Sequence, residues 1–388
     1  MEKIKTIIHF SQDFTKGKPQ LGGFSRIFNI CSDANKHIIY TISTEILEME
    51  EYYIDKILVI QVPVKERPNG VFNQFKLYNP IANEIIKHLK EIAIQPDLFF
   101  GHSHQGNFLI LKKVRDKLFP ELKILWEANG IGGCPKIQKP FKARIANRIQ
   151  YRLQKYVFKK SDKIIAQTVM SKKFISDEFN IIKNKIEVVP NAIHTIEKQV
   201  NNYKNFEKIK ILCFGLFDEL NGIPFFVKIL KKNSFKNIEF VFAGQGKYLN
   251  DIKELVNNID SISYLGQLPY KEMMKVLPSF HYIVIPRIST LGGELYIPTK
   301  LLEAMQLGVI PICSDVKGMT CVVTDKINGF VFEKENTEEL KKVFTSILKF
   351  DIERYNLMQK NAFELVNKKY SWEMNFKTLS MVYNHVSN

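Results

Sequence analysis

The chain has 388 residues, of which 45% are hydrophobic and 25% charged. This length and composition suit two or three globular domains and exclude long disordered, collagen-like or coiled-coil architectures. The formal net charge is +16, and residues 1–195 hold most of it, with 31 Lys and Arg against 19 Asp and Glu, or +12.

Nothing in the sequence predicts a membrane span, a secretion signal or a disulfide framework. No apolar run reaches the length of about 18 residues that a spanning helix needs. The apolar start, Met1 to Phe10, is too short for a signal-peptide core. The five cysteines are odd in number and lack CxxC spacing, which argues against a disulfide scaffold or a zinc knuckle. We therefore expect a cytoplasmic protein.

Short apolar segments alternate with amphipathic ones along almost the whole chain. Such alternation predicts parallel sheets covered by helices on both faces. Helices are expected at 80–92 and 108–118, among others. Strands are expected first at 6–10, 38–42, 57–62, 98–101, 124–126, 163–166 and 186–189, and then at 209–214, 238–243, 262–264, 282–285 and 309–313.

The series of strands occurs twice, with a polar stretch at 197–208 between the halves. We therefore predict an α/β protein of two doubly wound, Rossmann-like domains joined near residue 197. Ligands of such sheets bind beyond the carboxyl ends of the strands. Residues that directly follow strands are therefore the candidates for chemistry.

The most informative segment runs from Tyr282 to Cys313. A strand leads into a loop, and Pro298 then begins a helix that Gly308 ends. Free N–H groups and the dipole at a helix start favour an anion, and Lys300 lies in that first turn. Glu303 lies on the same, largely apolar helix, where a carboxylate needs a partner. That partner is either a sugar or ribose diol, or Lys300 and the backbone in a purely structural role.

Two glycine-rich loops follow strands. Residues 19–26, PQLGGFSR, include Gly22 and Gly23 and open a helix, so they suit either a phosphate or sugar contact or an ordinary tight turn. Residues 242–249, FAGQGKYL, lack the third glycine of a dinucleotide fingerprint. We therefore expect a turn there rather than an NAD or FAD site.

His102 and His104 follow a predicted strand in the segment GHSHQG. No Cys, Asp or third His lies near them in sequence, so we interpret them as residues that line a cleft or cap a helix rather than as metal ligands. No Asp-x-Asp pair, the usual holder of a Mg²⁺–diphosphate, occurs in the chain. The sequence therefore predicts no metal site.

The segment 136–160 contains nine Lys and Arg and no acidic residue. Apolar residues recur every fourth position from Phe141 to Val157, and the basic residues fall on an adjacent face. This pattern suits a helix on an anionic membrane surface, or a domain helix whose charges are solvated. Nucleic acid is not expected, because no aromatic platform accompanies the charges.

In this order, the motifs resemble those of the family-4 glycosyltransferases over almost the whole chain. The resemblance implies a GT-B fold, in which two Rossmann-like domains face each other across a cleft. It implies an acceptor-side domain at 1–196, a nucleotide-sugar domain at 197–368 and a last helix, 369–388, that packs on the first domain. The matching motifs are GGFSR (22–26), PDLFFGHS (96–103), VVPNAI (188–193), FG…NGI (214–223), FAGQGK (242–247), YLGQLPYKEMMKVL (264–277), IPTKLLEAMQLGVIPICSD (297–315), INGFVF (327–332) and YSWE (370–373).

The resemblance also implies roles for individual residues. Glu303 would bind the nucleotide ribose, and Glu294 would be the first glutamate of the family's pair, one residue further away than usual. Leu216 and Asn221 stand where the family has a basic pair, so other cations must contact the diphosphate. The implied sets are Glu294, Lys300 and Arg287 for catalysis; Gly22, Gly23, Gly215, Lys247, Thr299, Lys300, Leu301 and Glu303 for donor binding; and His102, His104, Glu127 and Asn129 on the acceptor side.

The resulting hypothesis is a retaining, metal-independent glycosyltransferase without a cofactor. Its donor would be a nucleotide-diphosphate sugar, with UDP favoured. Its acceptor would be a glycan or lipid-linked molecule of bacterial surface polysaccharide synthesis, reached by peripheral contact with the membrane through 136–160. The alternatives are a nucleotide-sugar epimerase or phosphorylase on the same fold, or a non-catalytic glycan-binding or scaffolding paralogue. The sequence does not specify the sugar or the acceptor.

Overall fold

The computed structural model describes residues 3–12, 14, 22–66, 70–131, 141–197 and 207–387. Cys134, the start of the basic segment at 136–140, Pro19 to Leu21 and most of the predicted polar linker lie outside these residues. The chain divides into two compact units, which we describe separately. Unit 1 comprises Met1–Pro190 and Asn375–Asn388, and unit 2 comprises Asn191–Met374. The predicted domain boundaries at 196 and 368 differ from these limits by six residues each.

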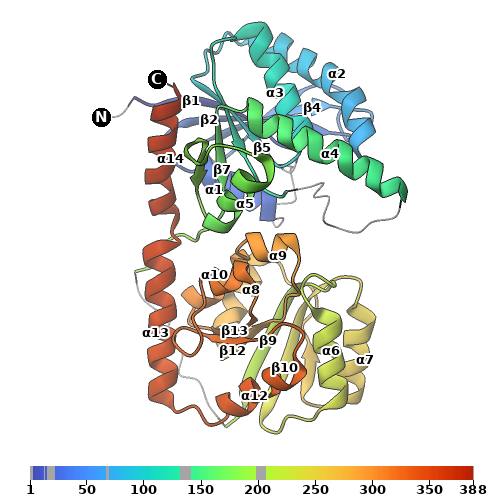
Figure 1. Ribbon diagram of the computed structural model, residues 1–388, viewed down its shortest axis with the longest axis vertical. Coiled ribbons are helices and arrows are strands. Elements are labelled where there is room, and N and C mark those ends of the chain that lie inside the picture. Colours follow the sequence, from blue (N-terminus) through green and yellow to red (C-terminus); the bar gives the residue numbers. More distant parts are fainter. Residues whose placement is uncertain are drawn as a thin grey trace. The chain divides into compact units, whose positions relative to one another are not determined.

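Unit 1 is built on an eight-stranded sheet in the order β3-β4-β2-β1-β5-β6-β7-β8 (Figure 1). All neighbouring strands are parallel except β3 and β4, which form an antiparallel pair. The strands are β1 (Thr6–Phe10), β2 (Lys36–Ser43), β3 (Glu50–Ile54), β4 (Ile57–Pro63), β5 (Leu98–His102), β6 (Ile124–Glu127), β7 (Lys163–Ala166) and β8 (Ile186–Val188).

The helices of unit 1 cover both faces of this sheet. Side chains of α2 (Gly70–Glu91), α3 (Gln105–Leu118), α4 (Phe141–Lys160) and α5 (Val169–Phe179) pack into one apolar cluster with alternate strand residues. Side chains of α1 (Gly22–Ile30) pack with Ile39, Ile57 and Val59 in a second cluster. Because side chains alternate along a strand, β2 and β4 supply residues to both clusters.

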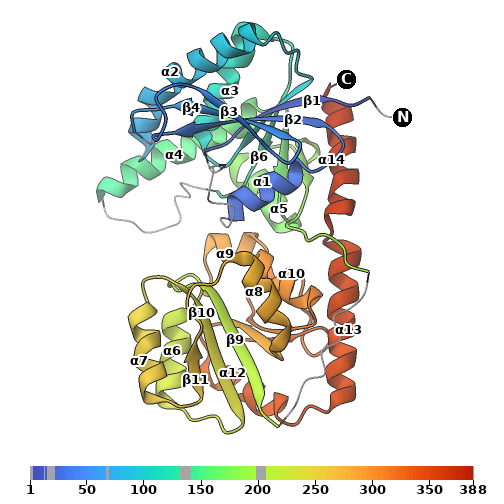
Figure 2. The ribbon, with the colours of Figure 1, turned by 180° about the vertical axis from the view of Figure 1, so that it is seen from behind.

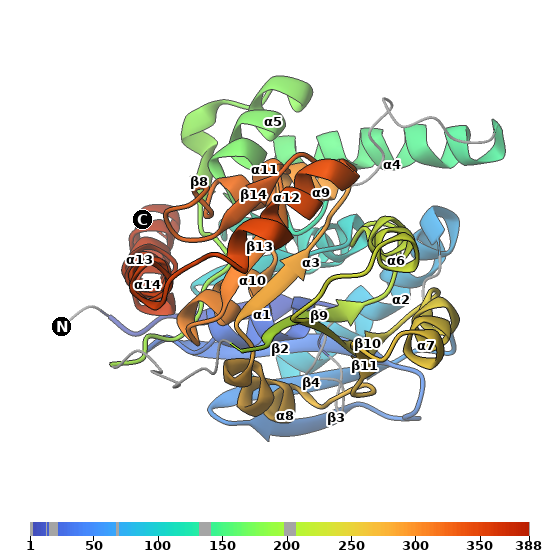
Figure 3. The same cartoon turned by 90° about the horizontal axis from the view of Figure 1, so that it is seen from below.

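Unit 2 has a six-stranded, fully parallel sheet in the order β11-β10-β9-β12-β13-β14. Helices α6 and α7 lie on one side of β9 and β10, and α8 and α10 lie on the other (Figures 2 and 3). The strands are β9 (Ile209–Leu216), β10 (Ile238–Gln245), β11 (Ile262–Tyr264), β12 (Tyr282–Ile285), β13 (Ile310–Ser314) and β14 (Phe330–Phe332). The helices are α6 (Ile223–Lys232), α7 (Leu249–Asn258), α8 (Tyr270–Val276), α9 (Leu291–Leu295), α10 (Thr299–Gln306), α11 (Lys317–Thr320), α12 (Thr337–Ile347) and α13 (Ile352–Lys369).

The last helix, α14 (Trp372–Ser387), begins in unit 2 and continues in unit 1. At its start, Trp372 N–H donates to the carbonyl of Ile193 at 2.9 Å. Further along, the ring of Tyr383 lies 6.4 Å from that of Phe100 on β5. The residues of α14 from Asn375 onward are therefore part of the unit 1 core.

The predicted architecture of two doubly wound α/β domains is confirmed, and every predicted strand is present. Two strands were not predicted, β3 and β14. The β3 sequence, EEYYI, contains no apolar run, because this edge strand leaves most of its side chains half-buried or exposed. Among the helices that the structure describes, none is long and apolar enough to cross a membrane.

Candidate functional site

Lys300 lies at the carboxyl end of the unit 2 sheet, in the first turn of α10. Its Nζ donates to the carbonyl oxygen of Phe214 near the end of β9, at 2.8 Å. The next residue, Gly215, has φ +113°, and a Cβ built there would lie 3.5 Å from Lys300 Nζ. Burial lowers the pKa of Lys300 to about 8. The ammonium is therefore a desolvated cation at the edge where ligands of such sheets bind.

Arg287 adds a second cation to the same edge, from the loop that follows β12. Its Nε is buried and has no hydrogen-bond partner within the described part of the chain. Burial lowers the pKa of Arg287, and the charge of Arg287 in turn lowers that of Lys300. The carboxylate of Asp218 raises the pKa of both Arg287 and Lys300. The two cations, one of which has an Nε without a partner among the described residues, favour an anionic ligand.

Glu303 lies one turn after Lys300 on α10. The hydroxyl of Tyr270, at the start of α8, donates to Glu303 Oε1 at 2.9 Å. Burial raises the pKa of Glu303, and the Tyr270 hydrogen bond and the Lys300 charge partly oppose this. The structural partner of the carboxylate is therefore Tyr270, a residue that the sequence analysis did not single out. Because Oε2 has no hydrogen-bond partner among the residues that the structure describes, this geometry is compatible with a second, diol partner.

Glu294 is held by its own loop. Ser289 Oγ donates to Glu294 Oε1 at 2.6 Å, and the N–H of Lys317 donates to Oε2 at 3.1 Å. The Thr290 side chain caps α9 by accepting from the N–H of Gly293 at 3.0 Å. These bonds fix the carboxylate at the start of a short helix, next to α11.

The glycines of FAGQGK are required by packing. Gly244 and Gly246 have φ of +141° and +147°. A Cβ on Gly244 would lie 2.0 Å from the carbonyl oxygen of Gly215, and one on Gly246 would lie 2.5 Å from that of Phe217. The predicted turn, rather than a dinucleotide fingerprint, accounts for both glycines. The neighbouring Lys247 is exposed and forms an ion pair with Glu219.

Two further residues of the predicted donor set lie at the start of α10. Thr299 is its first residue and is half-buried. Leu301 is fully buried in the core, and its N–H donates to the carbonyl of Pro298 at 3.0 Å. Neither the side chain nor the N–H of Leu301 is therefore available to a nucleotide-sugar donor, so the prediction that Leu301 binds the donor is wrong.

In unit 1, His102 and Glu127 meet at the ends of β5 and β6. His102 Nδ1 lies 2.7 Å from Glu127 Oε2, and both side chains are fully buried. Glu127 also pairs with Arg26 of α1, which in turn donates to the carbonyls of Val189 and Pro190 at 2.7 and 2.9 Å. Burial opposes ionisation of Glu127, but Arg26 and His102 hold its pKa at about 2.

This burial corrects the prediction that His102 and Glu127 contact an acceptor, because no part of either side chain reaches the surface. Instead, they link the ends of β5 and β6 to Arg26 of α1. Asn129 Oδ1 accepts from Gln167 Nε2 at 2.6 Å, and His104 is the N-cap residue of α3. Gly22 and Gly23 form the first turn of α1, four and three residues before Arg26.

Two family models match the chain. The model described as "Glycosyltransferase Family 4" matches residues 36–197, and that described as "Glycosyl transferases group 1" matches residues 195–365. The chain belongs to the family-4 glycosyltransferases. An uncharacterized glycosyltransferase of Methanocaldococcus jannaschii is 25% identical to it, over 100% of both chains. A UDP-Gal:alpha-D-GlcNAc-diphosphoundecaprenol alpha-1,3-galactosyltransferase of Escherichia coli is 21% identical, over 54% of this chain and 57% of its own.

Solved structures share the fold at low identity. The sucrose-phosphate synthase of Thermosynechococcus elongatus has a TM-score of 0.76 at 13% identity, covering 98% of this chain and 99% of its own. HepE of Anabaena in complex with UDP has a TM-score of 0.71 at 12% identity, covering 98% and 100%. These likenesses confirm the predicted GT-B fold.

This glycosyltransferase departs from the family pattern after β9. Leu216 is half exposed, and the Asn221 amide donates to the Leu216 carbonyl at 3.0 Å and to Asp218 Oδ1 at 2.8 Å. Asn221 therefore closes a local turn instead of supplying a charge. The cations that the structure places near this turn are Lys300 and Arg287, whereas Lys247 is engaged by Glu219.

Proposed function

We propose that this glycosyltransferase transfers a sugar from a nucleotide-diphosphate sugar, with retention of anomeric configuration. The observation that carries the proposal is the pair formed by Lys300 and Arg287 at the carboxyl edge of the unit 2 sheet. One cation is desolvated and the other has a buried, unpartnered Nε. A diphosphate supplies negative charge for both cations and an acceptor oxygen for the Arg287 guanidinium.

Each residue then has a defined part. Lys300 and Arg287 stabilise the charge that grows on the leaving diphosphate, with the α10 N-terminus as an additional dipole. The leaving phosphate oxygen accepts the proton of the attacking acceptor hydroxyl while the new glycosidic bond forms on the same face. Glu303, oriented by Tyr270, accepts hydrogen bonds from the ribose hydroxyls. Glu294 faces the donor sugar. The scheme uses no metal ion and no cofactor.

The relatives favour UDP and a lipid-linked acceptor. HepE structures contain UDP and UDP-glucose, and the Escherichia coli relative is named for UDP-Gal and a diphosphoundecaprenol acceptor. A further relative is an uncharacterized protein in a Klebsiella pneumoniae cps region. For this chain we infer a UDP-sugar donor, a glycan or lipid-linked acceptor and a role in bacterial surface polysaccharide synthesis.

A nucleotide-binding screen followed by a transfer assay tests this function. We expect UDP and UDP-sugars to raise the melting temperature, since a ligand at about 100 times its Kd stabilises by about 2.7 kcal/mol. Activity should persist in EDTA. Lys300→Ala and Arg287→Ala should lower kcat more than they raise the donor KM, because the charge they stabilise grows in the transition state. Failure of all UDP-, GDP-, ADP- and CMP-sugars to bind would contradict the proposal.

Unit 1 presents a basic surface that suits peripheral contact with an anionic membrane. Arg148 and Arg152 of α4 are exposed. The apolar stripe of this helix is exposed at Ile145 and fully buried at Val157, so it packs into the core at one end only. A groove of about 840 Å³ between α2 and α3 adds five lysines and one aspartate, namely Lys87, Lys90, Lys112, Lys113, Lys117 and Asp116.

Liposome co-sedimentation tests the membrane contact. Wild type should bind anionic vesicles at low salt and be released at 1 M salt, where the Debye length is about 3 Å. Replacing Arg148, Arg152 and Lys155 by Gln should abolish binding, since each contributes about 1 kcal/mol. UDP binding is the control that should not change. Wild type that ignores anionic vesicles at low salt would make α4 an ordinary domain helix.

A further inference from the structure

A continuous line of polar side chains crosses the buried sheet of unit 1. It runs from Glu127 on β6 through His102 on β5 and His9 on β1 to His37 on β2, and it ends at Asp33. The four contacts are 2.7 Å (Glu127 Oε2 to His102 Nδ1), 2.9 Å (His102 Nε2 to His9 Nδ1), 2.8 Å (His9 Nε2 to His37 Nδ1) and 2.8 Å (His37 Nε2 to Asp33 Oδ1). None of these side chains is more than 8% exposed.

The number of protons in this line does not match the number of contacts. A hydrogen bond needs one proton between its two heavy atoms, so four contacts need four protons. A neutral imidazole carries one N–H, so three neutral histidines supply three. One contact would then set two lone pairs against each other at hydrogen-bond distance. The line therefore requires one more proton.

The neighbouring groups do not supply the missing proton. The pKa of Glu127 is held at about 2, and despite burial the bond from His37 lowers that of Asp33. Burial raises the pKa of the Cys31 thiol. Its Sγ lies 3.6 Å from His9 Nε2 and 4.0 Å from His9 Nδ1. Since it is almost equally far from both nitrogens, it lies beside the ring and off the Nε2 lone pair.

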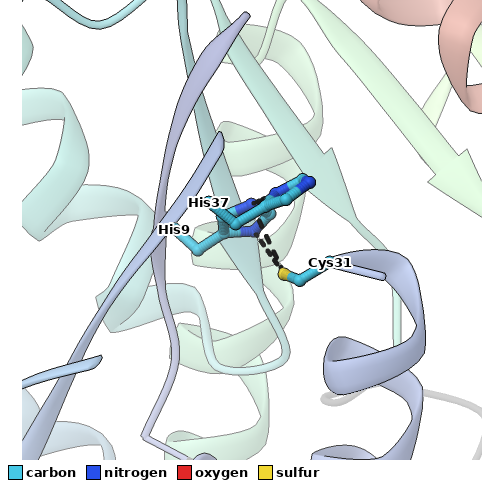
Figure 4. Close-up of side chains that lie close together, drawn as sticks. All are labelled: His9, Cys31 and His37. Atoms are coloured by element: carbon cyan, nitrogen blue, oxygen red, sulfur yellow. Dashed lines mark hydrogen bonds between the residues drawn. The ribbon is translucent and has the colours of Figure 1, made fainter. Parts of the chain in front are cut away.

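A metal ion does not fit this geometry either, although His9, Cys31 and His37 are ligand types for zinc and lie together (Figure 4). Two nitrogens at about 2.05 Å from one tetrahedral ion are roughly 3.3 Å apart. The observed 2.8 Å between His9 Nε2 and His37 Nδ1 is the length of a hydrogen bond. In addition, a metal on the Nε2 lone pair would be too far from Sγ.

We propose that His37 is a buried imidazolium that donates to both Asp33 and His9. His9 and His102 then remain neutral: the Nδ1–H of His9 donates to His102 Nε2, and the Nδ1–H of His102 donates to Glu127 Oε2. All four contacts are satisfied, and two positive groups, Arg26 and His37, balance two carboxylates. Burial, followed by the charge of His37, lowers the pKa of His9, which agrees with a neutral imidazole at the centre.

Other groups around the line leave this balance unchanged. Lys56 is exposed and donates to the backbone carbonyl of Ser32 at 3.1 Å. From α14, the buried Tyr383 hydroxyl has no hydrogen-bond partner among the described residues. Burial and the nearby charges of Asp33, Cys31 and Glu127 raise the pKa of Tyr383, so it remains a neutral phenol.

The extra proton couples His37 to the ion pair between Glu127 and Arg26, which attaches α1 to the sheet. Without it, the lone-pair contact can move along the line, because each imidazole can exchange its N–H between the two nitrogens. At the end of that shift Glu127 loses the bond from His102 and keeps only Arg26. We therefore expect alkaline pH to weaken the attachment of α1, which begins at Gly22 and Gly23. This inference rests on unit 1 alone and does not depend on the proposed reaction.

Nitrogen-15 NMR of the histidine-labelled full chain tests the protonation state directly. At pH 7.5 we expect both nitrogens of His37 to have imidazolium shifts and His9 and His102 to be neutral Nδ1–H tautomers. Asp33→Asn should make His37 neutral at that pH. His385→Gln, at an exposed position of α14, is the matched control and should change nothing in the line. Three neutral imidazoles, or a stoichiometric metal ion bound through His9 and His37 in the purified protein, would overturn the proposal.

The pH dependence of stability is the second test. A proton that the folded chain binds and the unfolded chain does not makes the stability fall as the pH rises. For one such proton the folding constant falls tenfold per pH unit. His37→Gln should lack this loss between pH 6.5 and 8.5, whereas His194→Gln, at a half-exposed position, should retain it. Parallel slopes for wild type and His37→Gln would refute the imidazolium.

Discussion

Nucleotide-sugar binding should draw a proton onto Lys300. Burial lowers the pKa of this residue to about 8, so at pH 8 about half of the free molecules carry the ammonium. A diphosphate oxygen beside Nζ stabilises the charged form. We therefore expect an uptake of about 0.5 proton per bound UDP-glucose at pH 8. Near pH 6.5 the uptake should fall below about 0.1, because the group is already protonated.

Isothermal titration calorimetry in buffers of different ionisation enthalpy measures this number. The diphosphate of UDP-glucose is a diester without a group that titrates near pH 8, so the proton must come to the protein. Lys300→Met should abolish the uptake and weaken binding by roughly 1.5–3 kcal/mol, the value of a charged hydrogen bond. Lys231→Met on α6, which removes a lysine that pairs with Glu254 at 2.8 Å, is the matched control. Tight binding to wild type without proton uptake at pH 8 would refute a Lys300–diphosphate contact.

Three further changes give distinct outcomes. Glu303→Gln should weaken UDP binding by about 1.5–3 kcal/mol with little change in melting temperature, and an unchanged Kd would exclude a ribose contact. Glu127→Gln leaves Arg26 as a buried, uncompensated cation, so chemical denaturation should show a loss of roughly 3–5 kcal/mol; a loss below about 1 kcal/mol would mean that the pair is not buried in solution. Gly244→Ala should cost more than the roughly 1–3 kcal/mol of its backbone conformation, because its Cβ would also lie 2.0 Å from the carbonyl oxygen of Gly215. Gly292→Ala, whose Cβ meets open space, should stay within about 0.5 kcal/mol.

The strands of both sheets were predictable because their burial leaves a direct trace in the sequence. A parallel strand covered on both faces is apolar at every position, as in Tyr282–Ile285. The edge strand β3 leaves no such trace. It forms because Asp55 adopts φ +53° in the tight turn to β4, and its residues then pair with 57–61. That pairing depends on the partner strand and not on the apolar content of Glu50–Ile54.

The candidate site of unit 2 was partly predictable for the same local reason. Pro298, Lys300 and Glu303 lie within the first two turns of one helix, so their spacing alone places them together. Tyr270 and the carbonyl of Phe214 come from distant parts of the chain and were missed, although they orient Glu303 and Lys300. For the line of histidines in unit 1, the sequence offered one indication, namely that each histidine lies within a strand or at its end.

The sequence by itself determined the alternation of strands and helices, the two doubly wound domains and the resemblance to family-4 glycosyltransferases, because these follow from periodicity and from motifs that are contiguous in the chain. Only the tertiary structure decided that His102 and Glu127 are buried supports and that Arg26 joins them from α1. It also decided that His9 and His37 continue the line to Asp33. The physical reason is that strand order in a parallel sheet places β2, β1, β5 and β6 side by side, so residues up to about a hundred positions apart share the hydrogen bonds that set their charge.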